Sequence, residues 1–332
     1  MNGAGIKTVA WVGGRFFHEH LAAWGITARH VACESPAVLT WDDVVERAGC
    51  TPDMVVYADR SLPPPLAGVE SFPCPTAFYC IDSHIHGWYP AYAQGFDLCC
   101  ASLKDDLPKF ALRLDPAQLL WLPPVPADDA VPRAENTKWD LLFVGKVDPE
   151  TTPIRHAFLA ELGRRFPGLV VHQGDFKALF PKARLVLNIA ERGDLNFRVF
   201  EALACGACLI TPEIAQGQAE LFTPGEHLFT YPPGDVEALL ALVRDLLADE
   251  ARRERVAKAG NARVESAHRL RHRAASFAGF VSGQPLKRLA AARLREAASI
   301  RERFLRLVYL HWAEQFRDSP LGPRYLAAAQ GR

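Results

Sequence analysis

The sequence carries no net charge and no long apolar run, and these two absences exclude several classes of protein. Its 332 residues include 38 basic and 38 acidic side chains, so no basic excess indicates a nucleic-acid partner. No stretch of about 20 apolar residues occurs, and the sequence therefore predicts no membrane span. The N-terminus does not show the pattern of a secretory signal peptide. We therefore expect a cytoplasmic protein without a nucleic-acid partner.

The cysteines lack any regular spacing, and the sequence lacks an internal repeat. Eight cysteines in 332 residues therefore indicate free thiols in a reducing compartment rather than a disulfide framework. The remaining composition is that of a globular protein, with 49% apolar and 23% charged residues. The length is sufficient for two domains with sizeable cores.

The first half of the chain alternates apolar runs with helical segments. The first run, at residues 7–12, ends at Gly13 and Gly14, and a helical segment follows at residues 16–24. A strand, a glycine turn and a helix in this order are typical of the start of a Rossmann-like domain. Further strands of this half are predicted at residues 27–32, 53–57, 76–81, 97–102 and 119–122. Thr40, with acids at positions 42 and 43, predicts the capped start of a helix, and the proline-rich run at residues 61–66 predicts a surface loop.

A proline-rich and polar segment near residues 122–138 predicts a linker, after which the alternation restarts. We therefore predict an N-terminal Rossmann-like domain at residues 1–125, a linker at 126–138, and a second Rossmann-like domain at 139–283. In the second domain, strands are predicted at 140–144, 169–171, 185–189 and 208–211, and helices at 152–166, 176–180, 197–204, 235–247 and 250–267.

Residues 284–332 predict a C-terminal helical extension. Apolar side chains recur there near a period of 3.6 residues, with arginine and glutamate between them. Such a helix packs either on the first domain or on another subunit. A homo-oligomer formed through these helices is therefore one of two open alternatives.

The most informative stretch is residues 194–213, which reads as a loop, a helix and a strand. Asn196 is placed to cap a helix at 197–204, and Gly206 suits the left-handed position that ends it. The N-terminus of a helix attracts phosphate, and Arg198 adds a cation that can make two parallel hydrogen bonds. Glu201 lies one turn further on and can accept hydrogen bonds from sugar hydroxyls. An ordinary capped helix is the simpler alternative.

The same stretch resembles a glycosyltransferase family. It is similar to the CgeB, or spore-maturation-protein, type of glycosyltransferase, and a weaker likeness extends over about residues 5–275. The pattern is Asn-x-Arg-x-Phe-Glu-Ala-x-Ala-Cys-Gly, and the residues that match it are Asn196, Arg198, Phe200, Glu201, Ala202, Ala204, Cys205 and Gly206.

The resemblance implies the GT-B fold, in which two Rossmann-like domains face a cleft. It implies sugar transfer from a nucleoside-diphosphate sugar to an acceptor, which is a glycan, a protein or a small molecule, without a metal or other cofactor. The wider retaining group carries Glu-x7-Glu, and Glu201 matches the second acid. The position of the first acid is Gly193, with Glu191 and Asp194 near it, so retention of the anomeric configuration is the weaker expectation.

The predicted donor site combines glycine turns with cations near helix starts. Each glycine turn lets a phosphate approach the backbone, and Arg198 is also predicted to stabilise the departing diphosphate as a catalytic group. The predicted donor-binding residues are Gly13, Gly14, Gly145, Arg155, Asp194, Asn196, Arg198 and Glu201.

The segment Asp82-Ser83-His84-Ile85-His86 follows a predicted strand. Ligands bind at the carboxyl ends of parallel strands, so Asp82 and His84 are predicted to position or deprotonate an acceptor hydroxyl. Two alternatives stay open. His-x-His after a strand also resembles the metal ligands of amidohydrolase-type enzymes, and a nucleotide-sugar-binding protein of the same fold needs no turnover.

Overall fold

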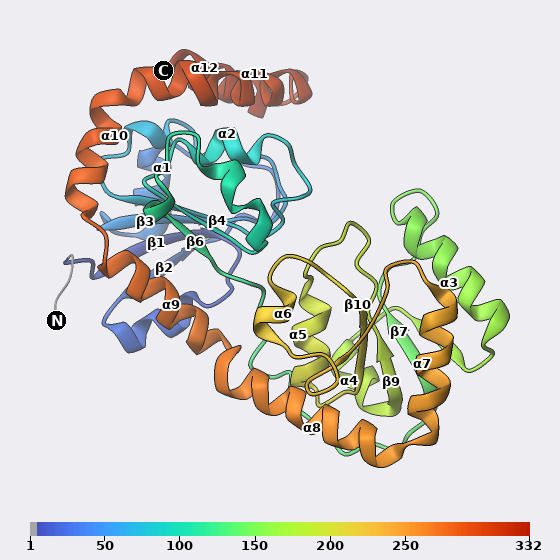
Figure 1. Cartoon of the computed structure of the whole chain (residues 1–332). Coiled ribbons are helices and arrows are strands. Elements are labelled where there is room, and N and C mark those ends of the chain that lie inside the picture. The colour runs from blue at the N-terminus through green and yellow to red at the C-terminus, as the bar shows by residue number, and fades with distance from the viewer. Residues whose placement is uncertain (1–4) are drawn as a thin grey trace. The chain divides into compact units, whose positions relative to one another are not determined.

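The computed structural model describes residues 5–332, and the chain divides into two compact units. Unit 1 comprises Met1–Pro123 and Arg273–Arg332, and unit 2 comprises Pro124–His272. Each unit is built on its own parallel sheet, as Figure 1 shows. The division falls at residues 123 and 272, whereas the sequence predicts domain ends at 125 and 283.

Unit 1 contains a six-stranded parallel sheet in the order β2-β1-β3-β4-β5-β6. The central strands are apolar throughout because both faces of a parallel sheet are covered. The predicted strands of the first half are confirmed to within a few residues. They are β1 (Thr8–Gly13), β2 (Thr27–Val31), β3 (Met54–Ala58), β4 (Thr76–Cys80), β5 (Leu98–Ala101) and β6 (Leu119–Trp121).

The helical segment predicted after β1 is present, and residues His18–Trp24 form it as a 3₁₀ helix, η1. Its N-cap is Phe17, whose side chain cannot accept a capping hydrogen bond. By contrast, Thr40 caps α1 (Trp41–Ala48) through a capping box with Asp43, as predicted. The other helices between the strands are η2 (Val69–Ser71), α2 (Tyr89–Ala93), η3 (Lys104–Phe110) and η4 (Pro116–Gln118).

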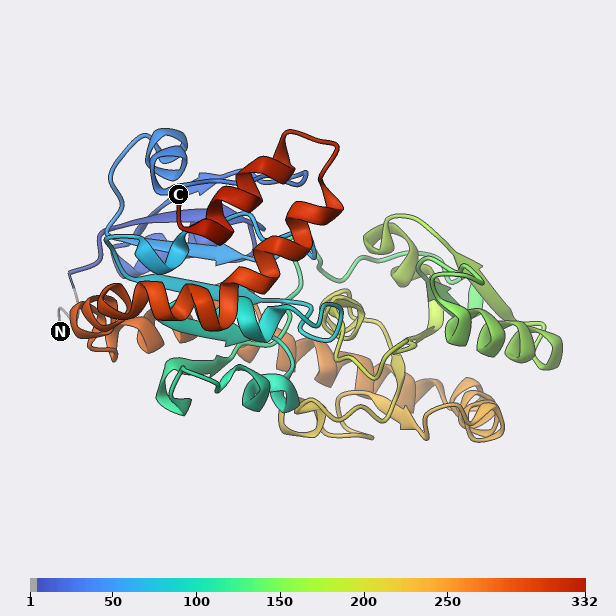
Figure 2. The same cartoon turned by 90° about the horizontal axis from the view of Figure 1, so that it is seen from above.

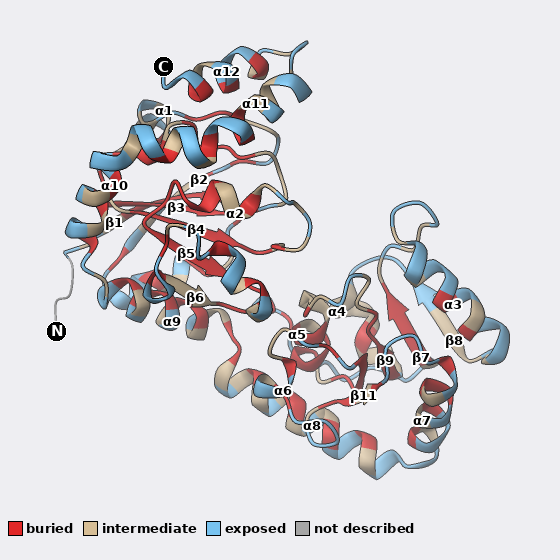
Figure 3. Cartoon of the chain, turned by 45° about the horizontal axis from the view of Figure 1, so that its top comes forward, coloured by how far each residue is buried: buried red, intermediate tan, exposed pale blue. Residues whose placement is uncertain are grey.

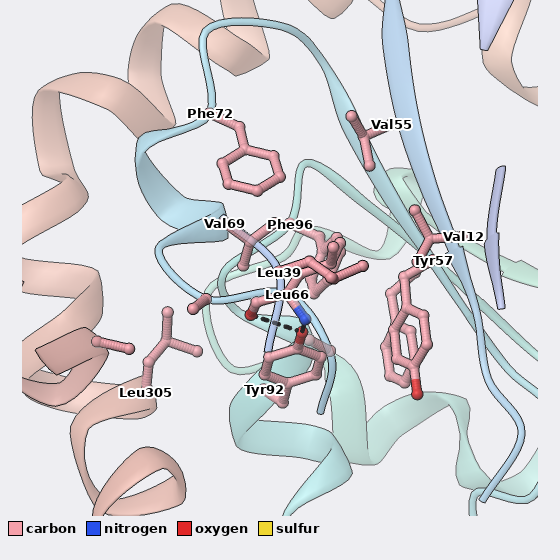
Figure 4. Packing of buried hydrophobic residues seen from close by; sticks show 14 of the residues in the cluster. Val12, Leu39, Val55, Tyr57, Leu66, Val69, Phe72, Tyr92, Phe96 and Leu305 are labelled. Carbon is pink, nitrogen blue, oxygen red and sulfur yellow. Dashed lines mark hydrogen bonds between the residues drawn. The ribbon is translucent and has the colours of Figure 1, made fainter. Parts of the chain in front are cut away.

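The C-terminal helices pack on unit 1. Figures 1 and 2 show α10, α11 and α12 lying over this unit, and Leu305 enters its apolar core beside Val69 and Tyr92 (Figure 4). Tyr92 is itself fixed by hydrogen bonds with the backbone of Leu66. The helices are α9 (Leu270–Ser282), α10 (Leu286–Ile300), a π-helical turn η6 (Arg301–Leu305), α11 (Arg306–Gln315) and α12 (Leu321–Gln330).

Unit 2 contains a five-stranded parallel sheet in the order β11-β10-β9-β7-β8. The strands are β7 (Trp139–Val144), β8 (Leu169–His172), β9 (Ala183–Leu187), β10 (Leu209–Pro212) and β11 (Phe229–Tyr231). The helical segments are α3 (Pro153–Arg165), α4 (Phe176–Leu179), η5 (Phe180–Lys182), α5 (Phe197–Ala204), α6 (Gln218–Leu221), α7 (Val236–Ala248) and α8 (Glu250–Ala267). The sequence did not predict β11, which is only three residues long.

Burial follows this layered arrangement. Figure 3 shows buried strands in both units and helices that expose one face. All eight cysteines are free, which confirms the prediction of free thiols. Within the described part of the chain, no helix has both the length and the apolar character that crossing a membrane requires.

Candidate functional site

The strand order of unit 2 creates a switch point between β7 and β9. From β7 the chain moves to β8 on one side, and then returns to β9 on the other side of β7. The connections therefore leave in opposite directions from the carboxyl ends of β7 and β9. Ligands of open parallel sheets bind at such points.

Arg198, in the first turn of α5, reaches this switch point. Its Nε donates a hydrogen bond to the carbonyl of Val144 at the end of β7, at 2.8 Å. Its Nη1 donates to Oδ1 of Asn188, one residue beyond β9, at 3.0 Å. The guanidinium also lies over the Phe143 ring, 4.6 Å from the ring centroid. Both strand ends therefore orient Arg198.

Among residues 5–332, no carboxylate contacts Arg198, and the charges of Glu201 and Asp194 act on it only from further away. Its two hydrogen-bond acceptors are neutral, and no carboxylate of the described residues forms an ion pair with it. Burial, and then the charge of Arg155, lower the pKa of Arg198 to about 10. An arginine remains charged at neutral pH despite such a shift. The site therefore holds a cation that an anionic ligand would stabilise.

Gly145 is required because Arg198 occupies the space beside it. A Cβ atom built on Gly145 would overlap Nη2 of Arg198. The Gly145 amide is already used, since it donates to the carbonyl of His172. The predicted glycine turn after β7 is therefore present, and the structure shows that it makes room for a cation of the protein.

Arg155 brings a second guanidinium to the same ring. Its Cζ lies 5.6 Å from the Phe143 ring centroid, and its Nη1 donates to the carbonyl of Lys146. The Nε of Arg155 is buried and lacks a hydrogen bond, although a carboxylate oxygen of Glu191 lies 3.9 Å away. Arg155 and Arg198 thus form a pair of neighbouring cations, since the charge of Arg155 lowers the pKa of Arg198.

Glu191 binds the N-terminus of α3. Its two carboxylate oxygens accept hydrogen bonds from the amides of Ile154 and Arg155, at 3.0 and 2.9 Å. A carboxylate of the protein therefore occupies the position where a helix N-terminus attracts an anion. Gly193 has φ of +73°, a conformation that disfavours glutamate. The position of the first acid of Glu-x7-Glu is therefore held by a glycine in a left-handed conformation.

Asn196 occupies the N-cap position of α5 as predicted, but its side chain makes no capping hydrogen bond. Instead, Nδ2 contacts the carbonyl of Ile189 at 3.5 Å, which turns the amide away from the helix. Its Oδ1 is buried and has no hydrogen-bond partner. The prediction that Asn196 is the N-cap residue is therefore confirmed, whereas the prediction that its side chain caps the helix is wrong.

Glu201 lies one turn beyond Arg198 on the same helix. Burial raises the pKa of Glu201 to about 7, and the nearby charge of Arg198 opposes this shift only in part. No hydrogen bond from a described residue stabilises its charged form. Asp194, in the preceding loop, accepts only a long hydrogen bond from the amide of Arg192, at 3.4 Å. Five predicted donor residues of unit 2, namely Gly145, Arg155, Asn196, Arg198 and Glu201, thus gather around β7 and α5.

Gly13 and Gly14 lie in unit 1, at the carboxyl end of β1. Gly13 has φ of +97°, and a Cβ atom there would overlap the carbonyl oxygen of Ala58 on the neighbouring strand. The Gly14 amide donates to the same carbonyl at 2.9 Å. Both glycines are buried. Gly13 permits close packing of β1 and β3, whereas a Cβ atom on Gly14 would overlap the Phe16 ring. Their predicted contact with the donor stays a prediction.

Asp82 and His84 follow β4 and lie in a polar cluster that the sequence showed only in part. Oδ2 of Asp82 accepts a hydrogen bond from Oγ of Ser61 at 2.5 Å. The Nδ1 atom of His84 is buried and has no hydrogen-bond partner in the described part of the chain. Nε2 of His86 interacts with the carbonyl of Ser61 at 3.2 Å.

The sequence prediction missed three polar residues of these sites, namely Asp59, Ser61 and Asn188. Asp59 is fully buried immediately after β3, and Asn188 is fully buried immediately after β9. Polar side chains directly after apolar strands were the signal that could have found both. Ser61 lies in a proline-rich segment that predicted only a surface loop.

The amidohydrolase-type alternative requires a closed barrel, whereas the unit 1 sheet is open, with β2 and β6 at its edges. Among residues 5–332, no group of three or more histidine, cysteine, aspartate or glutamate side chains is arranged to hold a metal ion. The segment Asp82–His86 contacts Ser61 and the aromatic side chains of α2 instead.

Comparison with known proteins finds a likeness over part of the chain. Residues 134–279 match a protein-family model described as glycosyl transferase-like. No curated protein matches the chain.

Solved glycosyltransferase structures share the fold at low sequence identity. Sucrose-phosphate synthase from Thermosynechococcus elongatus is 15% identical, with a TM-score of 0.56, over 86% of this chain and 100% of that chain. HepE from Anabaena, in complex with UDP-glucose, is 12% identical, with a TM-score of 0.58, over 83% and 100%. The lipopolysaccharide galactosyltransferase WaaB is 10% identical, with a TM-score of 0.53, over 82% and 99%. The two parallel-sheet units and the C-terminal helices therefore constitute the GT-B fold.

Proposed function

We propose that this protein transfers a sugar from a nucleoside-diphosphate sugar to an acceptor, without a metal. Unit 2 binds the donor and unit 1 binds the acceptor. The proposal rests on the GT-B fold, on the glycosyl transferase-like match of residues 134–279, and on the cationic site at the switch point of unit 2. The narrower CgeB-like assignment belongs to the same proposal.

The observation that carries the proposal is the unpaired charge of Arg198. Its Nη2 makes no hydrogen bond with a described residue, although Nε and Nη1 are both held by strand ends. A diphosphate gains negative charge as the bond to the sugar breaks. A cation that is already oriented and partly desolvated stabilises that charge more than a mobile one does. Arg198, with Arg155 beside it, thus supplies what a metal supplies in other transferases.

Glu201 is proposed to hold the ribose of the nucleotide. Its carboxylate lacks a hydrogen-bond donor, while burial raises its pKa to about 7. Ribose hydroxyls donate hydrogen bonds to the charged form and favour it. Asn196 makes no capping hydrogen bond, and its buried Oδ1 has no hydrogen-bond partner among the described residues, so we assign this residue, with Asp194, to the same proposed site.

On the acceptor side, Asp82 or His84 is proposed to take the proton of the attacking hydroxyl. Both follow the carboxyl end of β4, and Asp82 is partly exposed. We propose retention of configuration only as the weaker part of the function, because Gly193 occupies the position of the first acid. Formation of a homo-oligomer through α10–α12 stays a prediction.

Calorimetry tests the donor site directly. Arg198→Ala and Glu201→Ala should each weaken UDP binding about 10- to 100-fold, because each removes a hydrogen bond that involves a charge. Arg192→Ala is the matched control, since Arg192 is an exposed arginine of the same loop and should leave the affinity unchanged. UDP is the first nucleotide to test because HepE binds UDP-glucose, and GDP is the second. Unchanged binding in both folded variants would remove the assignment.

A binding protein without turnover is the second candidate, and the glycine at position 193 favours it. Release of UDP or GDP from a panel of nucleotide sugars, with and without glycan acceptors, separates the two functions. An enzyme releases the diphosphate at a rate that Arg198→Ala lowers by roughly 30- to 1000-fold. A binding protein retains the bound sugar nucleotide intact.

A further inference from the structure

The polar cluster after β3 and β4 holds Asp82 by one oxygen only. Oγ of Ser61 donates to Oδ2 of Asp82, whereas Oδ1 makes no hydrogen bond with a described residue. Asp82 is also partly exposed. One carboxylate oxygen is therefore fixed, and the other is available to an incoming hydroxyl.

Ser61 is itself fixed at three atoms. Its amide donates to Oδ1 of Asp59 at 2.9 Å, its carbonyl contacts Nε2 of His86 at 3.2 Å, and its hydroxyl donates to Asp82. The backbone of Ser61 has φ of +57°, which is costly for a residue with a side chain. Such a conformation persists only where its surroundings determine it, and here Asp59 and His86 do so.

Asp59 fixes the position of Ser61 from the interior of unit 1. It is fully buried, and besides the Ser61 amide it accepts hydrogen bonds from the hydroxyls of Tyr57, at 3.2 Å, and Tyr89, at 2.7 Å. These partners come from β3 and α2, two elements that are distant in sequence. Asp59 cannot contact a substrate, because no part of it reaches the surface.

From this geometry we propose that Asp59 and Ser61 are positioning residues that direct the free oxygen of Asp82 toward the acceptor hydroxyl. The inference rests on the proposed function and selects Asp82 over His84 as the proton acceptor. The chain of contacts runs from Asp59 through the Ser61 amide and hydroxyl to Asp82. The chain of contacts is continuous, and it ends at Oδ1 of Asp82, which accepts no hydrogen bond from a described residue.

The surroundings of Asp59 make its own charge adjustable. The titratable groups that face it are Tyr57, Cys80, Asp82 and Tyr89, and burial raises the pKa of the two tyrosines and of Cys80 so that they stay neutral. Burial, with the charge of Asp82 as a smaller cause, raises the pKa of Asp59 to about 6. The charged form of Asp59 accepts all three hydrogen bonds, so the positioning is complete only above that pH.

Two substitutions of Ser61 separate positioning from stability. Ser61→Gly and Ser61→Ala both remove the hydroxyl, but only glycine adopts a positive φ without strain. Both variants should lower kcat about 10- to 100-fold with the KM for the sugar nucleotide unchanged. Ser61→Gly should be at least as stable as the wild type. A purely structural contribution of Ser61 predicts instead that Ser61→Gly retains full activity.

The matched control is Ser83→Ala, which removes the hydroxyl beside Asp82. Oγ of Ser83 donates to Asp106 and not to Asp82, so kcat should stay unchanged. Asp59→Asn should lower kcat and remove the limb of its pH profile near pH 6. An unaltered profile in Asp59→Asn would overturn the role of that residue.

Crystal structures provide a readout that does not depend on turnover. In the wild type and in Ser83→Ala, Asp82 should have one orientation, and in Ser61→Gly it should occupy more than one. A single, unchanged orientation of Asp82 in Ser61→Gly contradicts the inference even if no donor is ever turned over. A wild-type protein that does not bind UDP would instead contradict the proposed function. The orientation of Asp82 in the crystal structures would still test the positioning by Ser61 separately.

Discussion

Glu201 and Asp59 are buried carboxyl groups, and each belongs to one of the two proposed sites. Burial raises the pKa of Glu201 to about 7 and that of Asp59 to about 6. The fold therefore disfavours the charged form of a carboxyl group in both proposed sites. Perturbed groups of this kind are concentrated at functional sites, and a ligand that donates hydrogen bonds can recover the lost stability.

The raised pKa of Glu201 predicts that donor binding releases protons. Ribose hydroxyls that donate to its carboxylate lower its pKa below about 7, so binding at pH 7 releases part of a proton, and affinity rises with pH up to about 7 and levels off above it. Calorimetry with UDP-glucose in buffers of different ionisation enthalpy measures this release. UDP-glucose is preferable to UDP because its diphosphate has no terminal ionisation near neutral pH. Glu201→Gln should abolish the buffer dependence, and a buffer-independent enthalpy in the wild type contradicts the assignment.

The raised pKa of Asp59 predicts how the free energy of unfolding changes with pH. Its folded pKa of about 6 lies above the value of about 4 in an unfolded chain. The stability contributed by the protonated form is therefore complete below about pH 4 and is lost as pH rises through 6. Relative to Asp59→Asn, the wild type should lose about 3 kcal/mol over this interval. Denaturant unfolding at several pH values measures the difference, and parallel curves for the two proteins would refute it.

Which residues could be predicted from sequence depended on how local their signal is. Arg198 and Glu201 lie within one helical turn, in a pattern that sequence alone shows. Asp59 meets Tyr89 across 30 positions of the chain, and Asn188 meets Arg198 across a loop. These contacts join residues of different elements. They depend on how the elements pack in space, which the sequence pattern does not contain.

At the scale of elements, the approach of α5 to β7 is set by Gly145. A Cβ atom there would overlap the Arg198 guanidinium, whereas Gly163 in α3 has only an ordinary contact with Leu169, at 3.8 Å. Gly145→Ala should therefore displace Arg198 and weaken UDP binding at least about tenfold. Gly163→Ala should stabilise α3 by up to about 1 kcal/mol and leave binding unchanged. Calorimetry and thermal unfolding of the two variants make the comparison, and equal UDP affinities would contradict the stated contact.

The prediction of elements succeeded where apolar period and capping residues agreed. Thr40 and the acids after it predicted the start of α1, and the capping box confirms it. Asn196 shows the limit, since its amide turns to the carbonyl of Ile189 and leaves α5 uncapped. The 3₁₀ helix η1 shows a second limit of prediction. A helical composition without a capping residue does not determine whether the helix is α or 3₁₀.

At the scale of the whole molecule, the C-terminal helices belong to the stability of unit 1. Arg293 of α10 is fully buried, pairs with Asp97 at 3.0 Å, and donates to the carbonyls of Val69, Glu70, Phe72 and Cys74. All five contacts lie on the unit 1 sheet or its connections. The tail thus braces its own chain, as one of the two alternatives from sequence predicted.

Arg293→Ala should destabilise unit 1 by about 3–5 kcal/mol, because it leaves Asp97 buried without its cation. Arg317→Ala is the control, since the 68% exposed Arg317 side chain pairs at the surface with Glu314 and should matter little. Thermal unfolding measures the effect. UDP binding to the folded Arg293→Ala protein at low temperature should persist, because the proposed contacts of UDP with Arg155, Arg198 and Glu201 lie in unit 2. Wild-type stability of Arg293→Ala would show that the tail is dispensable.

The most direct test of the account is a crystal structure of the protein with bound UDP. The account predicts that diphosphate oxygens contact the guanidinium of Arg198 at the ends of β7 and β9, with Arg155 beside them and the ribose hydroxyls on Glu201. A diphosphate bound at any other place, or an Arg198 that retains only its contacts with Val144 and Asn188, would contradict it.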